Sequence, residues 1–170
     1  IVAAVVWLGW YEYQEVLDTD RARSELEARV IDDHATRTVE TASLVMAYVG
    51  GQLHAPDMAQ AHKADPLLTQ ALAALPFVRS LHLLDGTGRV LASTAASDVG
   101  MAVPLERLGA TPAPEREVLG VFLPGRGLSA LAVTAPSAAA YIGFIPFSRG
   151  LRNAEGKTLL LVALINPDFL

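Results

Sequence analysis

The sequence predicts an α+β fold in which a long N-terminal helix packs on a five-stranded antiparallel sheet. Residues 12–53 contain no proline, their glycines are confined to positions 50 and 51, and charged and apolar residues alternate at helical spacing. Beyond residue 76, short segments rich in β-branched and large apolar residues are separated by glycine-bearing turns, which is typical of strands joined by hairpins. At 170 residues with 52% hydrophobic content, the chain can hold one domain and an appendage.

The first eleven residues carry no charge, and the first charged residue is Glu12. A helix needs roughly 20 apolar residues to cross a bilayer, so we interpret residues 1–13 as the final part of a transmembrane helix. Aromatic residues stand where such a helix would meet the lipid headgroups; they are Trp7, Trp10, Tyr11 and Tyr13. The start of a buried helix and the remnant of a signal peptide are the alternatives.

Residues 14–53 are predicted to continue as one helix with two parts. The mostly charged stretch 18–29 is expected to cross solvent as a stalk. Further along, apolar and small residues step by three and four positions, which forms a stripe suited to a partner helix or a sheet. This stripe consists of Ile31, Ala35, Thr38, Ala42, Val45 and Val49. Gly50 and Gly51 supply a helix stop.

Residues 54–170 are predicted to hold the remaining elements. Residues 58–75 look helical, with Pro66 opening a second short helix at residues 67–75. Residues 77–84 and 89–94 form a hairpin around the turn Asp85-Gly86-Thr87-Gly88. A short helix is expected at residues 104–108. The remaining strands are expected at 117–123 or 128–134, then at 139–147, and finally at 158–165.

Composition and spacing argue against several functions. The net charge of −5 and the scattered Lys and Arg residues do not favour a nucleic-acid partner, and the absence of cysteine excludes disulfides and thiolate metal sites. We expect no metal, because Asp32, Asp33 and His34 fan around a helix and because His54, Asp57 and His62 match no metal motif. The turn at residues 85–88 lacks the lysine of a phosphate-binding loop, and no nucleophile elbow occurs. We therefore expect neither a cofactor nor an enzyme.

Three motifs occur in a characteristic order. Residues 81–94 read Leu-His-Leu-Leu-Asp-Gly-Thr-Gly-Arg-Val-Leu-Ala-Ser-Thr, Ser148-Arg149 precede a glycine turn at Gly156, and the last strand runs into Asn166-Pro167-Asp168-Phe169. This arrangement resembles the Cache family of extracellular PAS-like sensor domains, over residues 25–170.

The resemblance implies a PAS-like sheet that cradles a small ligand, with the long helix on the opposite face mediating a homodimer. It also implies a receptor of the bacterial inner membrane, with residues 54–170 as a sensor module in the periplasm or outside the cell. A second module would follow in a double-module sensor. The implied cytoplasmic effector is a diguanylate cyclase, with a histidine kinase or a chemoreceptor as the next choices. A structural or dimerisation module that binds no ligand is the alternative.

Six residues are candidates for ligand binding. Arg149 offers a rigid fork of donors suited to an anionic ligand, although it could instead pair with Asp85, Glu155 or a backbone carbonyl. Tyr141 could stack on the ligand or be a satisfied core residue. His82 could report pH from a cavity or be an ordinary core or surface imidazole. Ser93, Ser148 and Asn166 belong to the motifs of the resemblance and complete the set. Asn166 replaces the aspartate with which amino-acid-binding members hold an amine, so amino-acid sensing is not expected.

Overall fold

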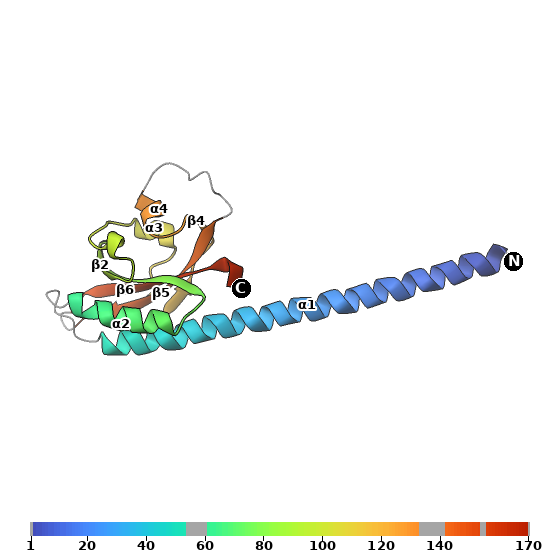
Figure 1. The fold of residues 1–170 in the computed structure, drawn as a ribbon, viewed down its shortest axis with the longest axis horizontal. Helices are drawn as coiled ribbons and strands as arrows, with labels where there is room; N and C mark the ends of the chain where they lie inside the picture. Colours follow the sequence, from blue (N-terminus) through green and yellow to red (C-terminus); the bar gives the residue numbers. More distant parts are fainter. Residues whose placement is uncertain (1, 54–60, 133–141, 154–155, 170) are drawn as a thin grey trace. The chain divides into compact units, whose positions relative to one another are not determined.

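The computed structural model describes residues 2–53, 61–132, 142–153 and 156–169 (Figure 1). The chain divides into two compact units, residues 1–37 and 38–170. Helix α1, Val2–Gln52, runs through both units and confirms the long N-terminal helix. Within the described residues, no helix contains an apolar stretch long enough to cross a bilayer.

The first unit consists of the N-terminal part of α1. Its residues 23–34 are exposed, and two ion pairs at i,i+4 spacing lie on its surface, Arg23–Glu27 at 3.0 Å and Asp33–Arg37 at 2.9 Å. These contacts agree with a solvated stalk. Ile31, which we had placed on the packing stripe, belongs to this unit and is 60% exposed, so only the later part of the stripe packs on the sheet.

In the second unit, the end of α1 packs on the sheet through Ala42, Met46 and Val49, all of which are at most 1% exposed. Helix α2, Ala61–Ala73, lies beside it and contributes Leu68 to the same core. The predicted helix break at Pro66 is wrong, because α2 runs through this residue. Pro66 has no backbone N–H, so α2 lacks the hydrogen bond from residue 66 to the carbonyl of His62, yet it continues to Ala73.

Six strands form one antiparallel sheet with the order β2-β1-β6-β5-β3, and β4 pairs with β5. The strands are β1 Val78–Asp85, β2 Val90–Ser93, β3 Glu117–Leu119, β4 Leu123–Pro124, β5 Gly143–Arg152 and β6 Thr158–Ile165. Short helices lie between the strands, and these are η2 Ala96–Asp98, α3 Leu105–Leu108 and α4 Ser129–Ala132, while η3 Pro167–Phe169 follows the last strand. The sheet therefore has the predicted five-stranded path plus one short additional strand.

Two strand predictions need correction. Of the two alternatives for the third strand, residues 117–123 are right, since β3 and β4 fall there, and residues 128–134 are wrong, since α4 occupies 129–132. The strand predicted at 139–147 begins at Gly143 and runs on to Arg152, while residues 139–141 lie outside the described residues. Gly150 continues the strand because it lets the carbonyl of Ala113 pass where a β-carbon would lie 2.4 Å away.

The sheet separates two hydrophobic cores. One face carries Leu81, Leu83 and Leu161 against α1 and α2. The opposite face carries Leu84, Leu160, Leu164 and Phe144. It is covered by Leu108 of α3 and by Val103 and Leu128, which precede α3 and α4 in the chain. Figure 1 shows α2 on one side of the strands and α3 and α4 on the other. We call these the helix face and the covered face of the sheet.

Candidate functional site

Three of the predicted site residues stand in one row across the covered face. His82 of β1 lies opposite Ser93 of β2 and opposite Val162 of β6, and Val162 lies opposite Ser148 of β5. Cross-strand partners in an antiparallel sheet project to the same side. The register therefore brings Ser93, His82 and Ser148 to the face opposite the long helices.

His82 is fully buried and bonds through both ring nitrogens. Its Nε2 lies 2.8 Å from the hydroxyl of Ser80, and its Nδ1 lies 2.9 Å from the hydroxyl of Ser93. The Ser93 hydroxyl also accepts a hydrogen bond from the backbone N–H of Ala95 at 2.9 Å. Removal of the ring from water lowers the pKa of His82 from 6.5 to about 4, so the imidazole is neutral at pH 7.

Asp98 is the functional candidate that sequence reasoning missed. It is 4% exposed, its Oδ2 lies 4.0 Å from Nδ1 of His82, and its Oδ1 accepts a hydrogen bond of 3.1 Å from Ser97. The contact with His82 counts as an ion pair only if the ring is protonated, and the low pKa of His82 leaves it uncharged at neutral pH. Sixteen positions separate the two residues, and only the hairpin and η2 bring them together, so no spacing rule could have linked them.

Arg149 lies on the helix face, away from this row. It follows Ser148 directly in β5 and so projects to the other side of the sheet. Its Nη1 donates to Oε1 of Glu117 at 2.5 Å, and Oε2 of Glu117 accepts a bond of 2.6 Å from the hydroxyl of Ser43 in α1. Arg149 and Ser148 therefore cannot line one cavity. The arginine pairs with an acid, as our alternative held, and this acid is Glu117; Glu155 lies outside the described residues.

A hollow of about 200 Å³ lies beside Arg149 on the helix face. Its walls come from the end of α1, including Gly50 and Gly51, from Glu115, and from Leu151 in β5. The Nε atom of Arg149 is buried without a hydrogen-bond partner. If Arg149 binds an anion, as predicted, the anion would have to occupy this hollow.

The two other candidates are Asn166 and Tyr141. Asn166 follows β6, where its Oδ1 accepts a bond of 2.5 Å from Nη2 of Arg79 and its N–H donates to the carbonyl of Phe77 at 2.8 Å. These contacts hold the start of β1 to the end of β6. Tyr141 lies outside the described residues.

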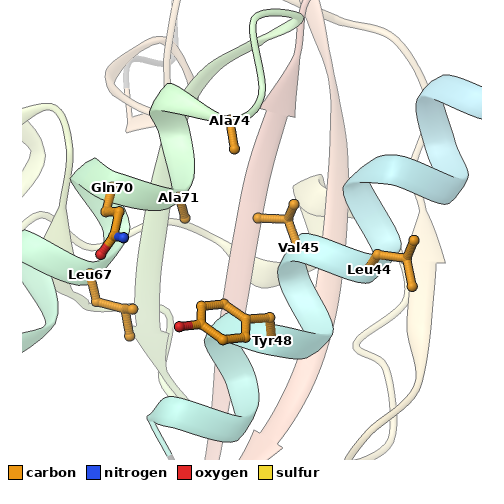
Figure 2. Close-up of a pocket in the computed structure, with 7 residues that line it drawn as sticks. All are labelled: Leu44, Val45, Tyr48, Leu67, Gln70, Ala71 and Ala74. Carbon is orange, nitrogen blue, oxygen red and sulfur yellow. The ribbon is translucent and has the colours of Figure 1, made fainter.

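A groove of about 270 Å³ runs between α1 and α2 on the outer side of the helices (Figure 2). Its lining is almost entirely apolar and consists of Leu44, Val45, Tyr48, Leu67, Gln70, Ala71 and Ala74. Figure 2 shows the Tyr48 ring reaching from α1 towards Leu67 of α2. Leu44 is 73% exposed and Tyr48 is 59% exposed, which is unusual for such large side chains.

Metal-ligating side chains do not gather in the described parts of the chain, where no three His, Asp or Glu residues could hold an ion. His34 and Asp33 lie on the exposed surface of α1. His54 and Asp57 are outside the described residues.

Comparison with known proteins bears on the fold. No family model matches the chain, and no curated protein matches it. Among solved structures, the extracellular domain of a protein named as a histidine kinase, rpHK1S-Z16, aligns with a TM-score of 0.52 at 16% identity, covering 80% of this chain and 53% of that one. An extracellular ligand binding receptor from Desulfohalobium retbaense DSM5692 aligns with a TM-score of 0.48 at 16% identity, covering 79% and 24%.

At such identities the likeness concerns the fold alone. The chain spans about half the length of the first of these structures and about a quarter of the second. A long helix on an antiparallel sheet is thus an arrangement already seen in a solved extracellular domain.

Proposed function

We propose that this chain is the PAS-like, Cache-type sensor module of a bacterial receptor, positioned in the periplasm or outside the cell and anchored in the inner membrane. One observation carries the proposal. A single helix, α1, begins in the apolar opening segment and ends packed on the sheet, whose other face carries a row of buried polar side chains. In this proposal the covered face binds the ligand, and α1 carries the signal from the sheet towards the membrane.

The covered face is the side on which the resemblance expects the ligand. Ser93, His82 and Ser148 project there among apolar side chains, and a few polar groups in an apolar setting are what a small-molecule site requires. An anionic ligand was expected on account of Arg149. Because Arg149 lies on the helix face, that expectation does not extend to the covered face.

Helix α1 is attached to the sheet by specific side-chain hydrogen bonds. Ser43 of α1, Glu117 of β3 and Arg149 of β5 form a chain of two hydrogen bonds, and the Arg149 and Glu117 side chains are only 17% and 19% exposed. A shift of α1 along the sheet must break or rebuild this link. Ligand binding would then act by favouring one position of α1, which demands a different affinity for each.

The proposed receptor is a homodimer that associates through α1. Leu44 and Tyr48 expose apolar surface beside the groove in the second unit, and Leu26 and Val30 are more than 60% exposed in the first. Apolar side chains at helical spacing suit a second helix. Residues 1–13 would end a membrane helix, and the favoured effector remains a diguanylate cyclase, followed by a histidine kinase or a chemoreceptor.

A thermal unfolding screen of the chain against organic acids, amines and nucleobase compounds tests ligand binding, because a compound that binds only the folded state raises the unfolding temperature. Ser148→Leu fills the covered face and should abolish the response, whereas Ser129→Leu, at an exposed serine of α4, should preserve it. A response that survives Ser148→Leu would place the bound compound away from the covered face, whereas the absence of any response in the screen would favour the alternative of a structural or dimerisation module.

A further inference from the structure

Four polar side chains are enclosed together at one end of the row on the covered face. Ser80, His82, Ser93 and Asp98 are 7%, 0%, 6% and 4% exposed. Gly127, in the covering loop 125–128 between β4 and α4, approaches this cluster, since a β-carbon there would stand 3.9 Å from Oδ2 of Asp98. Buried polar groups of this kind need partners, and a buried carboxylate needs a compensating positive charge.

In the described part of the chain, one positive charge is available to Asp98, and it exists only when His82 is protonated. The ionisable group nearest to the carboxylate is the His82 ring, with Nδ1 at 4.0 Å. Arg107 of α3 donates to the carbonyl of Leu131, while Arg89 beyond the hairpin turn and Arg126 in the covering loop are exposed. β2, β6 and α4 bring no ionisable residue to the cluster. Asp98 therefore gains a cation only when His82 is protonated.

The two hydroxyl partners can accept either state of the ring. A serine hydroxyl both donates and accepts, so Ser80 and Ser93 can satisfy a neutral imidazole or turn to accept both N–H groups of an imidazolium. Burial opposes the charged form and places the pKa of His82 at about 4. The hydrogen-bond geometry and the nearby carboxylate favour that form once the solution is acidic enough.

We propose that the proton is a ligand of the covered face, bound by His82 between Ser80, Ser93 and Asp98. The resulting pair of charges, His82 and Asp98, then displaces the segments that cover this face through Val103, Leu108 and Leu128. The proton comes from solvent and adds to the ring nitrogen that lacks hydrogen, and no other covalent bond of the protein changes. A proton needs no preformed cavity, so it can reach a ring that is fully buried. This inference rests on the proposed function, in which the covered face is the sensing face.

Movement of Asp98 would also move the covering segment that runs from η2 to Val103. Asp98 ends η2, and its N–H donates to the carbonyl of Ala95, the residue whose own N–H is held by Ser93. The segment after η2 returns to the hairpin, where the Met101 carbonyl accepts from the N–H of Val90 at 2.8 Å, and it then supplies Val103 to the covered-face core. Attraction between an imidazolium and Asp98 competes with the Ser93 contact at the start of this segment.

Nuclear magnetic resonance on the wild-type chain with labelled histidine tests the inference, and a substitution is needed only to assign the signals. His82 Nδ1 and Nε2 should titrate near pH 4, far below the pH of about 6.5 at which a histidine in an unfolded peptide titrates. Over the same pH range, and after correction for intrinsic exchange rates, the amide protons of Val90, Asp98 and Met101 should lose at least tenfold of their protection. His82→Gln identifies the resonances.

Two carboxylate variants complete the test. Asp98→Asn should lower the His82 midpoint further by at least half a pH unit, because the anion that favours the imidazolium is gone. Asp85→Asn removes a carboxylate from the turn of the same hairpin and should leave the midpoint unchanged. The inference is overturned if His82 stays neutral to pH 3.5, if Asp98→Asn does not shift its midpoint, or if it titrates without loss of protection. A receptor whose output ignores pH despite this titration would instead count against the proposed function.

Discussion

Gly50 of α1 and Leu151 of β5 touch so closely that a β-carbon on Gly50 would lie 2.7 Å from Cδ2 of Leu151. The contact sets the distance between the end of α1 and the helix face of the sheet. The neighbouring Gly51 has nothing within 4 Å of the same position. The two glycines at the end of the helix are therefore not equivalent.

We predict opposite effects for the two alanine substitutions. Gly51→Ala should stabilise the chain by about 0.5 kcal/mol, because alanine has less conformational freedom to lose in a helix. Gly50→Ala should instead destabilise it by about 1 kcal/mol, since Leu151 must leave a packed position. Urea unfolding of both variants measures the difference, and equal effects would contradict the close approach.

The Glu117 carboxylate is predicted to stabilise the attachment of α1. Glu117→Gln leaves a mostly buried guanidinium without its anion and should cost about 1 to 3 kcal/mol of unfolding free energy. Asp33→Asn is the matched control, because its pair with Arg37 is exposed and should contribute less than about 0.5 kcal/mol. Denaturant unfolding distinguishes them, and a Glu117→Gln loss as small as that of Asp33→Asn would show that the link is not a structural contact.

The turn of the first hairpin depends on Asp85. Its Oδ1 accepts bonds from the N–H and the hydroxyl of Thr87, at 2.8 and 2.6 Å, and from the N–H of Arg89 at 3.0 Å. Partial burial raises the pKa of Asp85, but these bonds and the Arg89 charge outweigh it and bring the pKa below 3.8. Because the folded state holds the ionised form, this contribution to stability is present above pH 3.8 and is lost as the pH falls below it.

Asp85→Ala should therefore cost about 1 kcal/mol at pH 7. The cost should shrink below pH 3.8, where the wild-type carboxyl becomes protonated as well. Unfolding at pH 7 and pH 3 provides the comparison, with Asp168→Ala as the control at an exposed aspartate. A cost that does not change with pH would rule out the charged carboxylate as the source.

The elements that could be predicted from the sequence are those with a strong local signal. The unbroken helical stretch, the Asp-Gly-Thr-Gly turn and the apolar run of β6 each carry their own pattern, and each was placed correctly. Residues 117–134 were ambiguous because β3 and β4 have three and two residues, too few for an alternating pattern to emerge. Pro66 was expected to separate two helices, but α2 continues through it.

The site was less predictable because it depends on which face of the sheet each strand presents. Ser148 and Arg149 were chosen together as adjacent motif residues, yet adjacency in a strand sends them to opposite faces. His82 and Ser93 came together because the hairpin register pairs them. Asp98 and Glu117 could not be singled out, because their partners, His82 and Arg149, are distant in sequence.

Association through α1 predicts a loss of dimer when its exposed apolar surface becomes charged. Leu44→Glu places a carboxylate on a side chain that is 73% exposed, so the fold should keep its stability to within about 0.5 kcal/mol while the dimer dissociates at least tenfold more readily. Gln52→Glu adds the same charge at the exposed end of the helix and should leave association unchanged. Sedimentation equilibrium reports both, and a chain that is monomeric before any substitution would exclude this interface.

Burial of His82 predicts a second pH dependence, in a window above that of Asp85. The folded state holds the ring with a pKa of about 4 against 6.5 in the unfolded chain, so below pH 6.5 the unfolded chain binds more protons. Stability should fall as the pH drops from 6.5 towards 4, by about 3 kcal/mol in all. His82→Gln, which cannot titrate, should lower stability at pH 7 but flatten this slope, and Ser97→Ala should keep it. If the slope between pH 6.5 and 4 is the same in His82→Gln as in the wild type, the acid sensitivity of the covered face belongs to another group.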